Sequence, residues 1–333
     1  MRLGGRPSAN VESLRPRHQV QVAVLGAGQW GSNLIRTFYE LGALAAVAEP
    51  DALRRSRVAE HHPDVRTLSR PEDVWSLPVP AVAIATPAPT HFKLAREALE
   101  AGKHVFVEKP LTLTARDAEE LVRIAEERGR TLMVGHLLLY QPAIGWIKQQ
   151  IDSGLIGAVV SLHQERLSLG RVRTAENAMW SLGVHDVAVL LYLVGRRPSH
   201  VSAYGHRVLQ PTIEDDVRVE FFFPGGVRAH LHSSWLWPEK RRRLTVIGMQ
   251  GMLVYDELQQ TVTLHRKSFG SNLEVIDGGA DVVFVGEGQP LRLECEHFLE
   301  VVQTGRRPLS DGRSGLEVVR VLEDAQRQLE HVS

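Results

Sequence analysis

The hexapeptide VEKPLT, residues 107–112, places an acid, Glu108, and a base, Lys109, directly after a short apolar run. Its preceding residues, Val105 and Phe106, predict a buried strand, and Pro110 halts it because proline has no N–H to donate. Open α/β sheets bind ligands at the carboxyl ends of their strands. Lys109 is therefore positioned to reach a bound substrate if VEKPLT belongs to such a sheet; otherwise it is an ordinary surface lysine.

A second residue suited to proton transfer, His185, stands in the apolar segment WSLGVHDVAVLLYLVG, residues 180–195, which predicts a helix. The ordinary pKa of imidazole, near ~6.5, suits proton transfer at neutral pH. A histidine on an apolar helix is equally often a packed core residue. The neighbouring Asp186 is expected to make a structural contact.

A glycine-rich loop, GAGQWG at 26–31, follows the apolar residues 20–25 and precedes an amphipathic stretch from about Ser32 to Leu41. This strand–loop–helix order, with Glu49 about 20 residues further on, is typical of dinucleotide binding. The loop backbone and the helix N-terminus bind the pyrophosphate. The Glu49 carboxylate is expected to accept hydrogen bonds from the ribose hydroxyls and to repel a 2′-phosphate, which favours NAD over NADP. Arg54 and Arg55 nearby weaken that preference.

Strands and helices alternate through the first half of the chain, which predicts a doubly wound parallel sheet, a Rossmann fold. Chemically active residues recur where its strands end, including Thr86 and Pro87 after 81–85 and His136 after 131–135. The predicted dinucleotide contacts are Gly26, Ala27, Gly28, Gln29, Trp30, Gly31, Glu49, Arg54, Thr86, Pro87, His91, Glu108, Lys109 and His136.

From about residue 135 the pattern changes to successive strand-like stretches with few helices between them. These predict a large, mostly antiparallel open sheet in a C-terminal α/β domain. The expected organisation is a flexible arm at 1–18, a dinucleotide-binding domain at 19–134 and a second α/β domain at 135–333 for substrate binding and oligomerisation. Two terminal helices are expected, at about 291–304 and 314–331, and the last is placed to fold back on the first domain.

Composition restricts the function classes. Among 333 residues, 39 Lys and Arg balance 39 Asp and Glu, which gives no general attraction to nucleic acid or membrane. No apolar run reaches the ~18 residues of a membrane span, and residues 1–19 lack the apolar core of a secretory signal. The single cysteine, Cys295, is expected to pack in a helix. One cysteine cannot form an intrachain disulfide, which fits a reducing cytoplasm.

Taken together, GAGQWG, the EKP motif and a histidine on a helix of the second half resemble the Gfo/Idh/MocA oxidoreductases over roughly residues 20–333. Members of that family oxidise or reduce a secondary alcohol of a sugar or cyclitol with NAD(P). Residues 135–144 and 166–186 resemble members acting on nucleotide-sugars, in particular those that oxidise the C3 hydroxyl of UDP-N-acetylglucosamine (UDP-GlcNAc). That 3-keto product serves an aminotransferase in lipid A synthesis.

The resemblance implies catalysis by Lys109 and His185, with His185 favoured as the base and Lys109 as the group that stabilises the alkoxide; the reverse assignment stays open. Many members have an Asp four residues before the helix histidine, where this chain has Ser181. The predicted substrate contacts are Lys109, Tyr140, Arg166, Arg173, Asn177, Trp180 and His185. Tyr140 fits core packing equally well, and Arg166 and Arg173 are expected to bind phosphate through their planar guanidinium groups.

No metal site is expected, because His230 and His232 share a strand face without an obvious third ligand. A homodimer or homotetramer formed through the second sheet is implied by the resemblance. Alternative substrates are UDP-N-acetylglucosaminuronate, a free sugar or a cyclitol. The remaining alternative is a non-catalytic NAD-binding regulator.

Overall fold

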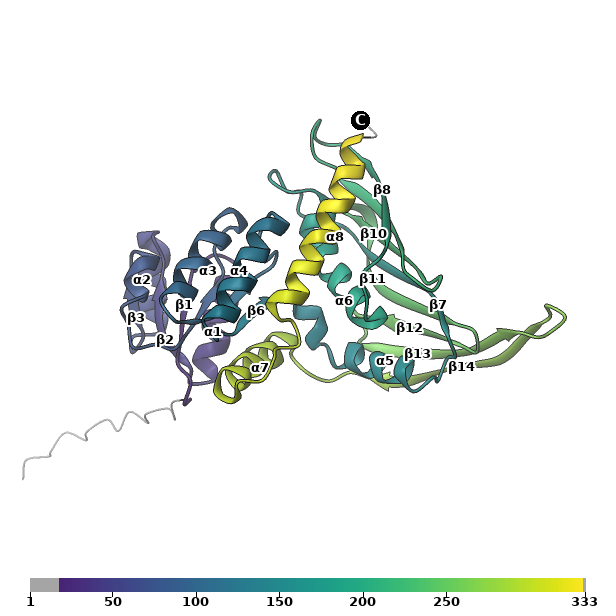
Figure 1. The fold of residues 1–333 in the computed structure, drawn as a ribbon, viewed down its shortest axis with the longest axis horizontal. Coiled ribbons are helices and arrows are strands. Elements are labelled where there is room, and N and C mark those ends of the chain that lie inside the picture. The colour runs from purple at the N-terminus through teal and green to yellow at the C-terminus, as the bar shows by residue number, and fades with distance from the viewer. Residues whose placement is uncertain (1–17, 332–333) are drawn as a thin grey trace, which may run out of the picture.

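Two β-sheets with their helices make up residues 18–331, the part of the chain that the computed structural model describes (Figure 1). The predicted N-terminal arm, apart from His18, lies outside the described residues. Within the described range, no helix combines the length and the apolar composition needed to cross a membrane.

The first sheet is parallel throughout and has the order β3-β2-β1-β4-β5-β6, which confirms the predicted doubly wound Rossmann sheet. Its strand order reverses between β1 and β4, the position at which such sheets bind ligands. The strands are β1 (Val22–Leu25), β2 (Leu44–Ala48), β3 (Arg66–Leu68), β4 (Ala81–Ile84), β5 (His104–Glu108) and β6 (Leu132–Gly135); the helices are α1 (Gly31–Glu40), α2 (Ala52–His61), α3 (His91–Glu100) and α4 (Ala115–Glu127).

The second sheet has the order β14-β13-β12-β11-β7-β10-β9-β8 and is antiparallel except for the pair β7 and β10, as predicted. Its strands are β7 (Val159–Leu169), β8 (His200–His206), β9 (Asp216–Phe222), β10 (Arg228–Ser234), β11 (Leu236–Gly248), β12 (Met252–Asp256), β13 (Thr261–Phe269) and β14 (Val275–Val285). Strand β14 was not predicted. Most of its residues are exposed, so the sequence shows no alternation of buried apolar residues.

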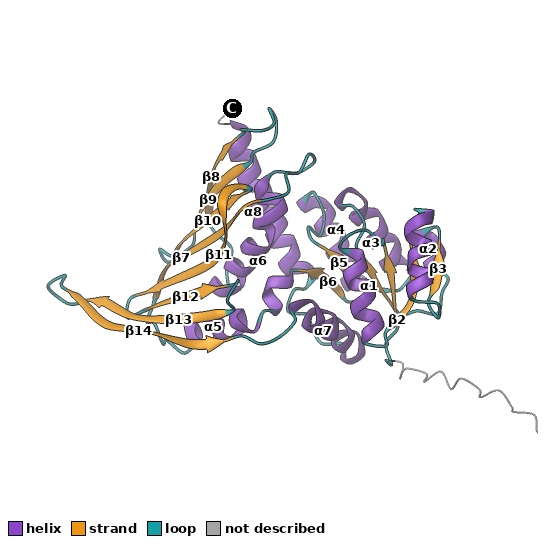
Figure 2. Cartoon of the chain, turned by 180° about the vertical axis from the view of Figure 1, so that it is seen from behind, coloured by secondary structure: helices purple, strands orange, loops and turns teal. Residues whose placement is uncertain are grey.

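The remaining helices are α5 (Pro142–Asp152), α6 (Val184–Val194), α7 (Pro290–Thr304) and α8 (Gly312–His331), with short helical turns η1 (Pro71–Val74), η2 (Ala88–Thr90), η3 (Leu137–Tyr140) and η4 (Met179–Gly183). Helices α5, α6 and α8 lie on one face of the second sheet, between it and the first sheet (Figures 1 and 2). Its other face carries no helix of the described chain in either view. The hairpin β13–β14 projects away from the body (Figure 2).

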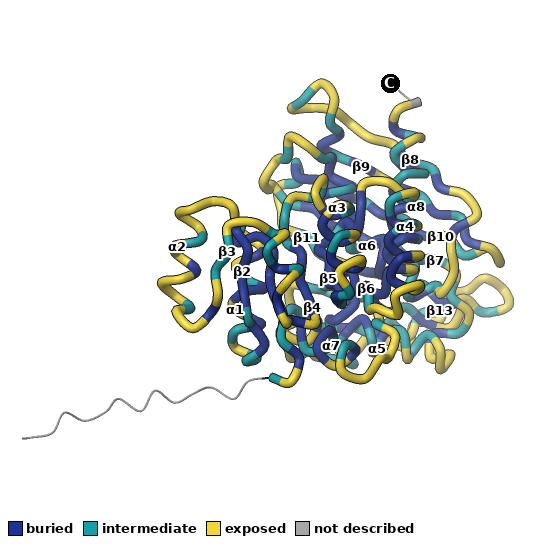
Figure 3. Tube along the Cα trace, turned by 60° about the vertical axis from the view of Figure 1, so that its left-hand side comes forward, coloured by how far each residue is buried: buried dark blue, intermediate teal, exposed yellow. Residues whose placement is uncertain are grey.

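One apolar cluster contains buried residues of both sheets, and a second packs against the first sheet; buried segments are dark blue in Figure 3. Helix α7 provides the connection on one side, where the Phe298 ring packs edge-on against Phe38 of α1 at 6.4 Å and Phe106 of β5 at 5.7 Å between centroids. Helix α8 provides a second connection, because Glu323 accepts a hydrogen bond of 3.0 Å from the backbone N–H of Ala115 in α4.

Replacing Phe298 with Ala should therefore lower the free energy of unfolding by about 3–5 kcal/mol, because a cavity forms where α7 meets the first sheet. Equilibrium urea unfolding measures the change. Leu293→Ala on the same helix is the matched control, since Leu293 is 37% exposed and should cost less than about 1 kcal/mol. Equal losses for the two variants would contradict a role for Phe298 in joining the sheets.

Candidate active site

The glycine-rich loop is packed closely against the first sheet. Gly26 has φ +93°, a conformation that only glycine adopts readily. A Cβ on Gly31 would stand 2.2 Å from the carbonyl oxygen of Gly26, whereas one on Gly28 would meet nothing nearer than 3.9 Å. The loop thus turns tightly at Gly26, packs helix on strand at Gly31 and stays open at Gly28. Helix α1 has no side-chain cap and no acid in its first turn, which leaves its N-terminal N–H groups suited to an anion.

The Glu49 carboxylate lies beneath this loop and is only 5% exposed. One oxygen accepts a hydrogen bond of 2.6 Å from the N–H of Ala27, and the other accepts one of 2.9 Å from the N–H of Asp51. Each carboxylate oxygen can accept more than one hydrogen bond, so the predicted contact with ribose stays a prediction. The contacts found here fix the shape of the loop.

Trp30 joins the loop to the EKP motif, since its indole N–H donates to the Glu108 carboxylate. The other Glu108 oxygen accepts a hydrogen bond of 3.2 Å from the backbone N–H of Lys109. Burial raises the pKa of Glu108 to about 7 despite these donors. Glu108 therefore acts as a bridge between the cofactor loop and the predicted catalytic lysine.

His91 connects the two loops that follow β4 and β5. It is 1% exposed, with Nδ1 2.8 Å from the carbonyl oxygen of Pro110 and Nε2 2.9 Å from that of Thr86. The Lys109–Pro110 peptide bond is cis. Both ring nitrogens are thus used within the protein, so the predicted contact between His91 and the cofactor has no support from its geometry. His91 instead aligns Thr86 and Pro87 with the EKP loop.

Lys109 reaches the second half of the chain, where its Nζ donates a hydrogen bond of 2.8 Å to the carbonyl oxygen of Ser181 in the π-helical turn η4. Burial lowers its pKa, while the charges of Glu176 and Glu108 oppose that shift. Glu176 was not among the predicted site residues. It lies on the loop after β7, where the sequence shows only a polar stretch.

His185 lies at the start of α6, and its Nδ1 is buried without a hydrogen-bond partner among the described residues. Burial and the nearby positive charge of Lys109 hold the pKa of His185 well below its ordinary value. The ring of His136 stands 6.5 Å away between centroids, at 85° to it. The structure thus brings together Lys109, His185 and His136, three residues predicted from separate motifs.

Asp186 makes the structural contact expected of it. It is fully buried and accepts hydrogen bonds from Gln164 at 2.6 Å and from the Arg166 Nε at 2.7 Å. Arg166 also forms an ion pair of 2.7 Å with Glu257. With two carboxylates around it, the Arg166 guanidinium is occupied within the fold, in contrast to the predicted phosphate contact.

Two other predicted substrate contacts also have partners inside the protein. The Asn177 amide donates to Glu214 at 2.8 Å and to Gln326 at 2.9 Å. The Tyr140 hydroxyl is buried and lies 2.8 Å from Ser310, which agrees with core packing, the alternative weighed for it. Arg173 and Trp180 keep exposed surface on the loop after β7 and at η4.

That loop also reaches the first sheet, because Arg171 donates a hydrogen bond of 3.1 Å to the side chain of Gln29 in the glycine-rich loop. A cation therefore stands over the segment predicted to hold the pyrophosphate. Spacing along the sequence cannot reveal this contact, since the two residues are 142 positions apart.

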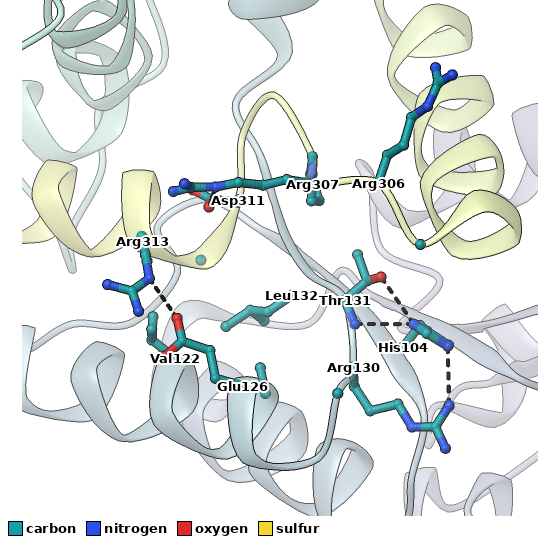
Figure 4. A pocket seen from close by; sticks show the side chains of 15 residues that line it. His104, Val122, Glu126, Arg130, Thr131, Leu132, Arg306, Arg307, Asp311 and Arg313 are labelled. Atoms are coloured by element: carbon teal, nitrogen blue, oxygen red, sulfur yellow. Dashed lines mark hydrogen bonds and ion pairs between the residues drawn. The ribbon is translucent and has the colours of Figure 1, made fainter.

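A separate pocket of about 420 Å³ lies at the amino ends of β5 and β6, away from the strand ends described above (Figure 4). Arg307 and Arg313 line it, but each is paired with a carboxylate, Asp311 and Glu126 respectively. Because sheets of this type bind ligands at the opposite edge, this pocket is not part of the candidate active site.

Comparison with known proteins agrees with the fold and with the grouping of these residues. Residues 20–136 match the model of an oxidoreductase family with an NAD-binding Rossmann fold, and residues 145–254 match the GFO/IDH/MocA C-terminal domain. The chain belongs to the Gfo/Idh/MocA oxidoreductase family.

Relatives within the Gfo/Idh/MocA family extend over nearly the whole chain. The UDP-N-acetylglucosamine 3-dehydrogenase of Acidithiobacillus ferrooxidans is 29% identical over 90% of this chain and 94% of its own. Its crystal structure superposes with a TM-score of 0.84 over 93% of this chain and 98% of its own, at 28% identity. The NAD-dependent scyllo-inositol 2-dehydrogenase of Bacillus subtilis is 28% identical over 88% of this chain and 89% of its own. An oxidoreductase structure from Magnetospirillum magnetotacticum is 32% identical, with a TM-score of 0.81 over 92% of this chain and 99% of its own.

Membership of the Gfo/Idh/MocA family makes the protein an NAD-binding oxidoreductase. No ligand is part of the structure, but the loop at Gly26–Gly31 and the uncapped N-terminus of α1 fit a dinucleotide. When bound, NAD accepts a hydride at its nicotinamide ring. The protein's own task is to orient an alcohol, remove its proton and stabilise the developing negative charge on oxygen. Lys109 and His185 are the residues predicted for that work, and the charge of Lys109 acts on His185.

Helix α7 contributes one acid that sequence analysis did not identify. Glu294 is fully buried, and neither carboxylate oxygen has a hydrogen-bond partner among the described residues. Burial raises its pKa well above the ordinary value, and the charge of Glu108 raises it further. A charge on either buried carboxylate therefore opposes ionisation of the other. The neighbouring Cys295 is buried, as expected of a packed thiol.

This pair makes stability depend on pH. The folded protein keeps protons on Glu108 and Glu294 that the unfolded chain loses near 4.5, so stability should fall as the pH rises from about 4.5 towards 7. Glu294→Gln removes one ionisable group and should raise the free energy of unfolding at pH 8 by about 1–3 kcal/mol, with a smaller gain at pH 5. Urea unfolding at both pH values measures this.

The matched control is Glu296→Gln, which changes an exposed acid on the same helix. It should alter stability by less than about 0.5 kcal/mol at either pH. A gain for Glu294→Gln that is the same at pH 5 and pH 8 would show that ionisation of Glu294 is not the cause.

Proposed function

We propose that this protein oxidises the C3 hydroxyl of UDP-N-acetylglucosamine to the 3-keto sugar with NAD as the hydride acceptor. The support comes first from the A. ferrooxidans UDP-N-acetylglucosamine 3-dehydrogenase, which matches 90% of this chain. It comes also from the site, where Lys109, at the end of β5, acts on His185 at the start of α6. In this proposal residues 19–134 hold NAD and residues 135–333 hold the sugar.

The proposed division of roles follows from charge. His185 is neutral because burial and Lys109 lower its pKa, so it is ready to accept the hydroxyl proton. Burial lowers the pKa of Lys109, while the charges of Glu176 and Glu108 oppose that shift. In this proposal the hydrogen bond to Ser181 positions Nζ, and a positive charge there stabilises the oxygen as the hydride leaves. Glu49 favours NAD through the ribose hydroxyls, as proposed from the sequence.

A substrate with a diphosphate group requires a cationic side chain that is free to bind its phosphates. Arg166 does not supply one, because Asp186 and Glu257 hold it. Arg173 remains, since among the described residues its ion pair is with Glu176 alone, at 3.9 Å, and 42% of its side chain is exposed. We assign Arg173 and Trp180 to the nucleotide part of the substrate. An aminotransferase would then consume the 3-keto product in the cytoplasm, as lipid A synthesis with a 3-amino sugar requires.

A cyclitol is the second candidate substrate, because the scyllo-inositol 2-dehydrogenase of B. subtilis is 28% identical over 88% of this chain. Thermal shift separates the two candidates, since a ligand stabilises only the state that binds it. Stabilisation by UDP alone favours the nucleotide-sugar, whereas stabilisation by scyllo-inositol with no response to UDP favours the cyclitol.

The direct test mixes the purified protein with NAD and UDP-N-acetylglucosamine and follows NADH by absorbance, including NADH that stays bound. Lys109→Ala should reduce turnover about 10²–10⁴-fold while the dissociation constant for NAD changes little, because the lysine acts on the substrate oxygen. Lys93→Ala, at an exposed position on α3, is the control and should retain full activity. If no NADH forms and neither NAD nor UDP-N-acetylglucosamine binds, the proposed function is wrong.

We further propose that the protein forms a homodimer or homotetramer through the helix-free face of the second sheet. Gln164 of β7 points towards Asp186 of α6, so its neighbours His163 and Glu165 face the other way. Trp237 belongs to the same face, because its ring packs against His232 at 5.6 Å. This face forms a shallow pocket lined by His163, Tyr204, His230, His232 and Trp237.

Trp237→Glu should therefore shift the protein towards a monomer, because a charge at the centre of an interface is costly to bury. Light scattering coupled to gel filtration measures the mass in solution. Leu113→Glu, an exposed position beside the first sheet, serves as the control and should leave the mass unchanged. A monomeric wild-type protein, or an unaltered oligomer in Trp237→Glu, would argue against this interface.

A further inference from the structure

The segment between β7 and η4, residues 170–178, reaches from the second sheet to the glycine-rich loop. Near its start, Arg171 donates a hydrogen bond of 3.1 Å to the side chain of Gln29. Further along, the side-chain amide of Gln210 donates a hydrogen bond of 2.8 Å to the carbonyl oxygen of Arg173. This stretch, here called the β7–η4 segment, is thus held on the second half of the chain while its first residues contact the first half.

Gln29 stands where a dinucleotide brings its pyrophosphate to the glycine-rich loop. The helix whose N-terminus receives this anion begins two residues later, at Gly31. Gly28, on the other side of Gln29, leaves space for a close approach, because a Cβ there would meet nothing nearer than Nη1 of Arg54 at 3.9 Å. A guanidinium bonded to Gln29 therefore lies next to the position expected for the pyrophosphate.

The charge of Arg171 is available to an anion. Its side chain is exposed and bonds to a neutral amide, and no acid among residues 18–331 forms an ion pair with it. That bond uses one of the five N–H donors of the guanidinium, which leaves the others for a further acceptor. Two other arginines near the site differ in this respect, since Arg166 is held by two acids and Arg173 is paired with Glu176.

We propose that Arg171 binds the pyrophosphate of NAD and that the β7–η4 segment thereby closes over the bound cofactor. The proposal rests on NAD binding, which family membership shows, and goes beyond the proposed function because it does not depend on the sugar. The planar fork of arginine matches two phosphate oxygens. Its bond to phosphate is also stronger than its bond to a neutral amide, so the guanidinium prefers the pyrophosphate over Gln29 when NAD is present.

A cofactor held in this way is enclosed by both halves of the chain. The glycine-rich loop binds the pyrophosphate from the first sheet, and Arg171 binds it from a segment that is held on the second. Release of the cofactor then requires the contact with Arg171 to break. Arg171 should therefore slow the dissociation of the cofactor more than it speeds association.

The test measures cofactor binding by the full-length protein without any sugar present. The fluorescence of NADH reports its binding, and rapid mixing of the NADH complex with excess NAD gives the dissociation rate. Arg171→Ala should raise the dissociation constant for NADH about 5–20-fold, because one charged hydrogen bond at an exposed position is lost. Most of that change should lie in the dissociation rate.

Fragments of the cofactor show which part of it Arg171 contacts. ADP-ribose contains the pyrophosphate and adenosine does not, and competition with NADH measures the affinity of each. Arg171→Ala should weaken ADP-ribose by the same factor as NADH and leave adenosine unchanged. The difference between variant and wild type should shrink as the salt concentration is raised, because salt screens exposed charges.

Arg128→Ala is the matched control, since it removes an exposed arginine at the end of α4, just before the amino end of β6. It should bind NADH with wild-type affinity. Arg171→Gln is a second variant, which keeps a hydrogen-bonding side chain without the charge, and it should weaken NADH as Arg171→Ala does. Thermal unfolding of each variant without ligand should match that of wild type, because both positions are exposed.

Wild-type affinity of Arg171→Ala for NADH overturns the proposal. An equal loss of affinity for adenosine and ADP-ribose also overturns it, since Arg171 would then act only on the shape of the loop. Failure of the proposed function is distinct from both results. A wild-type protein that binds NADH but forms none from NAD and UDP-N-acetylglucosamine overturns that function and leaves the role of Arg171 unaffected.

Discussion

The buried carboxylate of Asp186 fixes the position of α6, the helix that carries His185. Asp186 is completely enclosed, and a charge in that position is tolerated only because Arg166 and Gln164 bind both of its oxygens. Arg166 and Gln164 belong to β7, a central strand of the second sheet. Since Asp186 follows His185 directly, this contact sets the rotation of α6 and hence the place of the predicted base.

The same contact contributes to the positive charge around His185. Arg166 is held near His185 by Asp186 and Glu257, so it adds positive potential there without being free to bind a phosphate. Lys109, after β5, adds a second positive charge. Burial and these charges together keep His185 neutral, which is the protonation state that a base requires before an alcohol binds. A structural ion pair thereby tunes a reactive group that it does not touch.

Local patterns in the sequence predicted the Rossmann sheet, the mostly antiparallel second sheet and most helices, because glycine spacing, apolar runs and caps act over short distances. Thr114, for example, caps α4 through the N–H of Asp117, as the sequence indicates. Partners distant in sequence were not predictable. Arg166 was assigned to phosphate because neither Asp186 nor Glu257 is marked as its partner by any spacing. Glu294 was read as part of an ordinary amphipathic helix, since only the packing of α7 reveals that it is enclosed.

Ser181 stands four residues before His185, where the resemblance implies an aspartate, and its backbone carbonyl contacts Lys109 there. Lys109 donates to the backbone carbonyl of Ser181, a neutral acceptor that holds the lysine in place without cancelling its charge. Glu176 and Glu108 also act on Lys109, so these acids and the Ser181 carbonyl together set the charge available to stabilise a developing alkoxide. As a consequence, no carboxylate among the described residues orients the Nδ1 of His185. The orientation of His185 therefore rests on the position of α6, which the contacts of Asp186 with Arg166 and Gln164 fix.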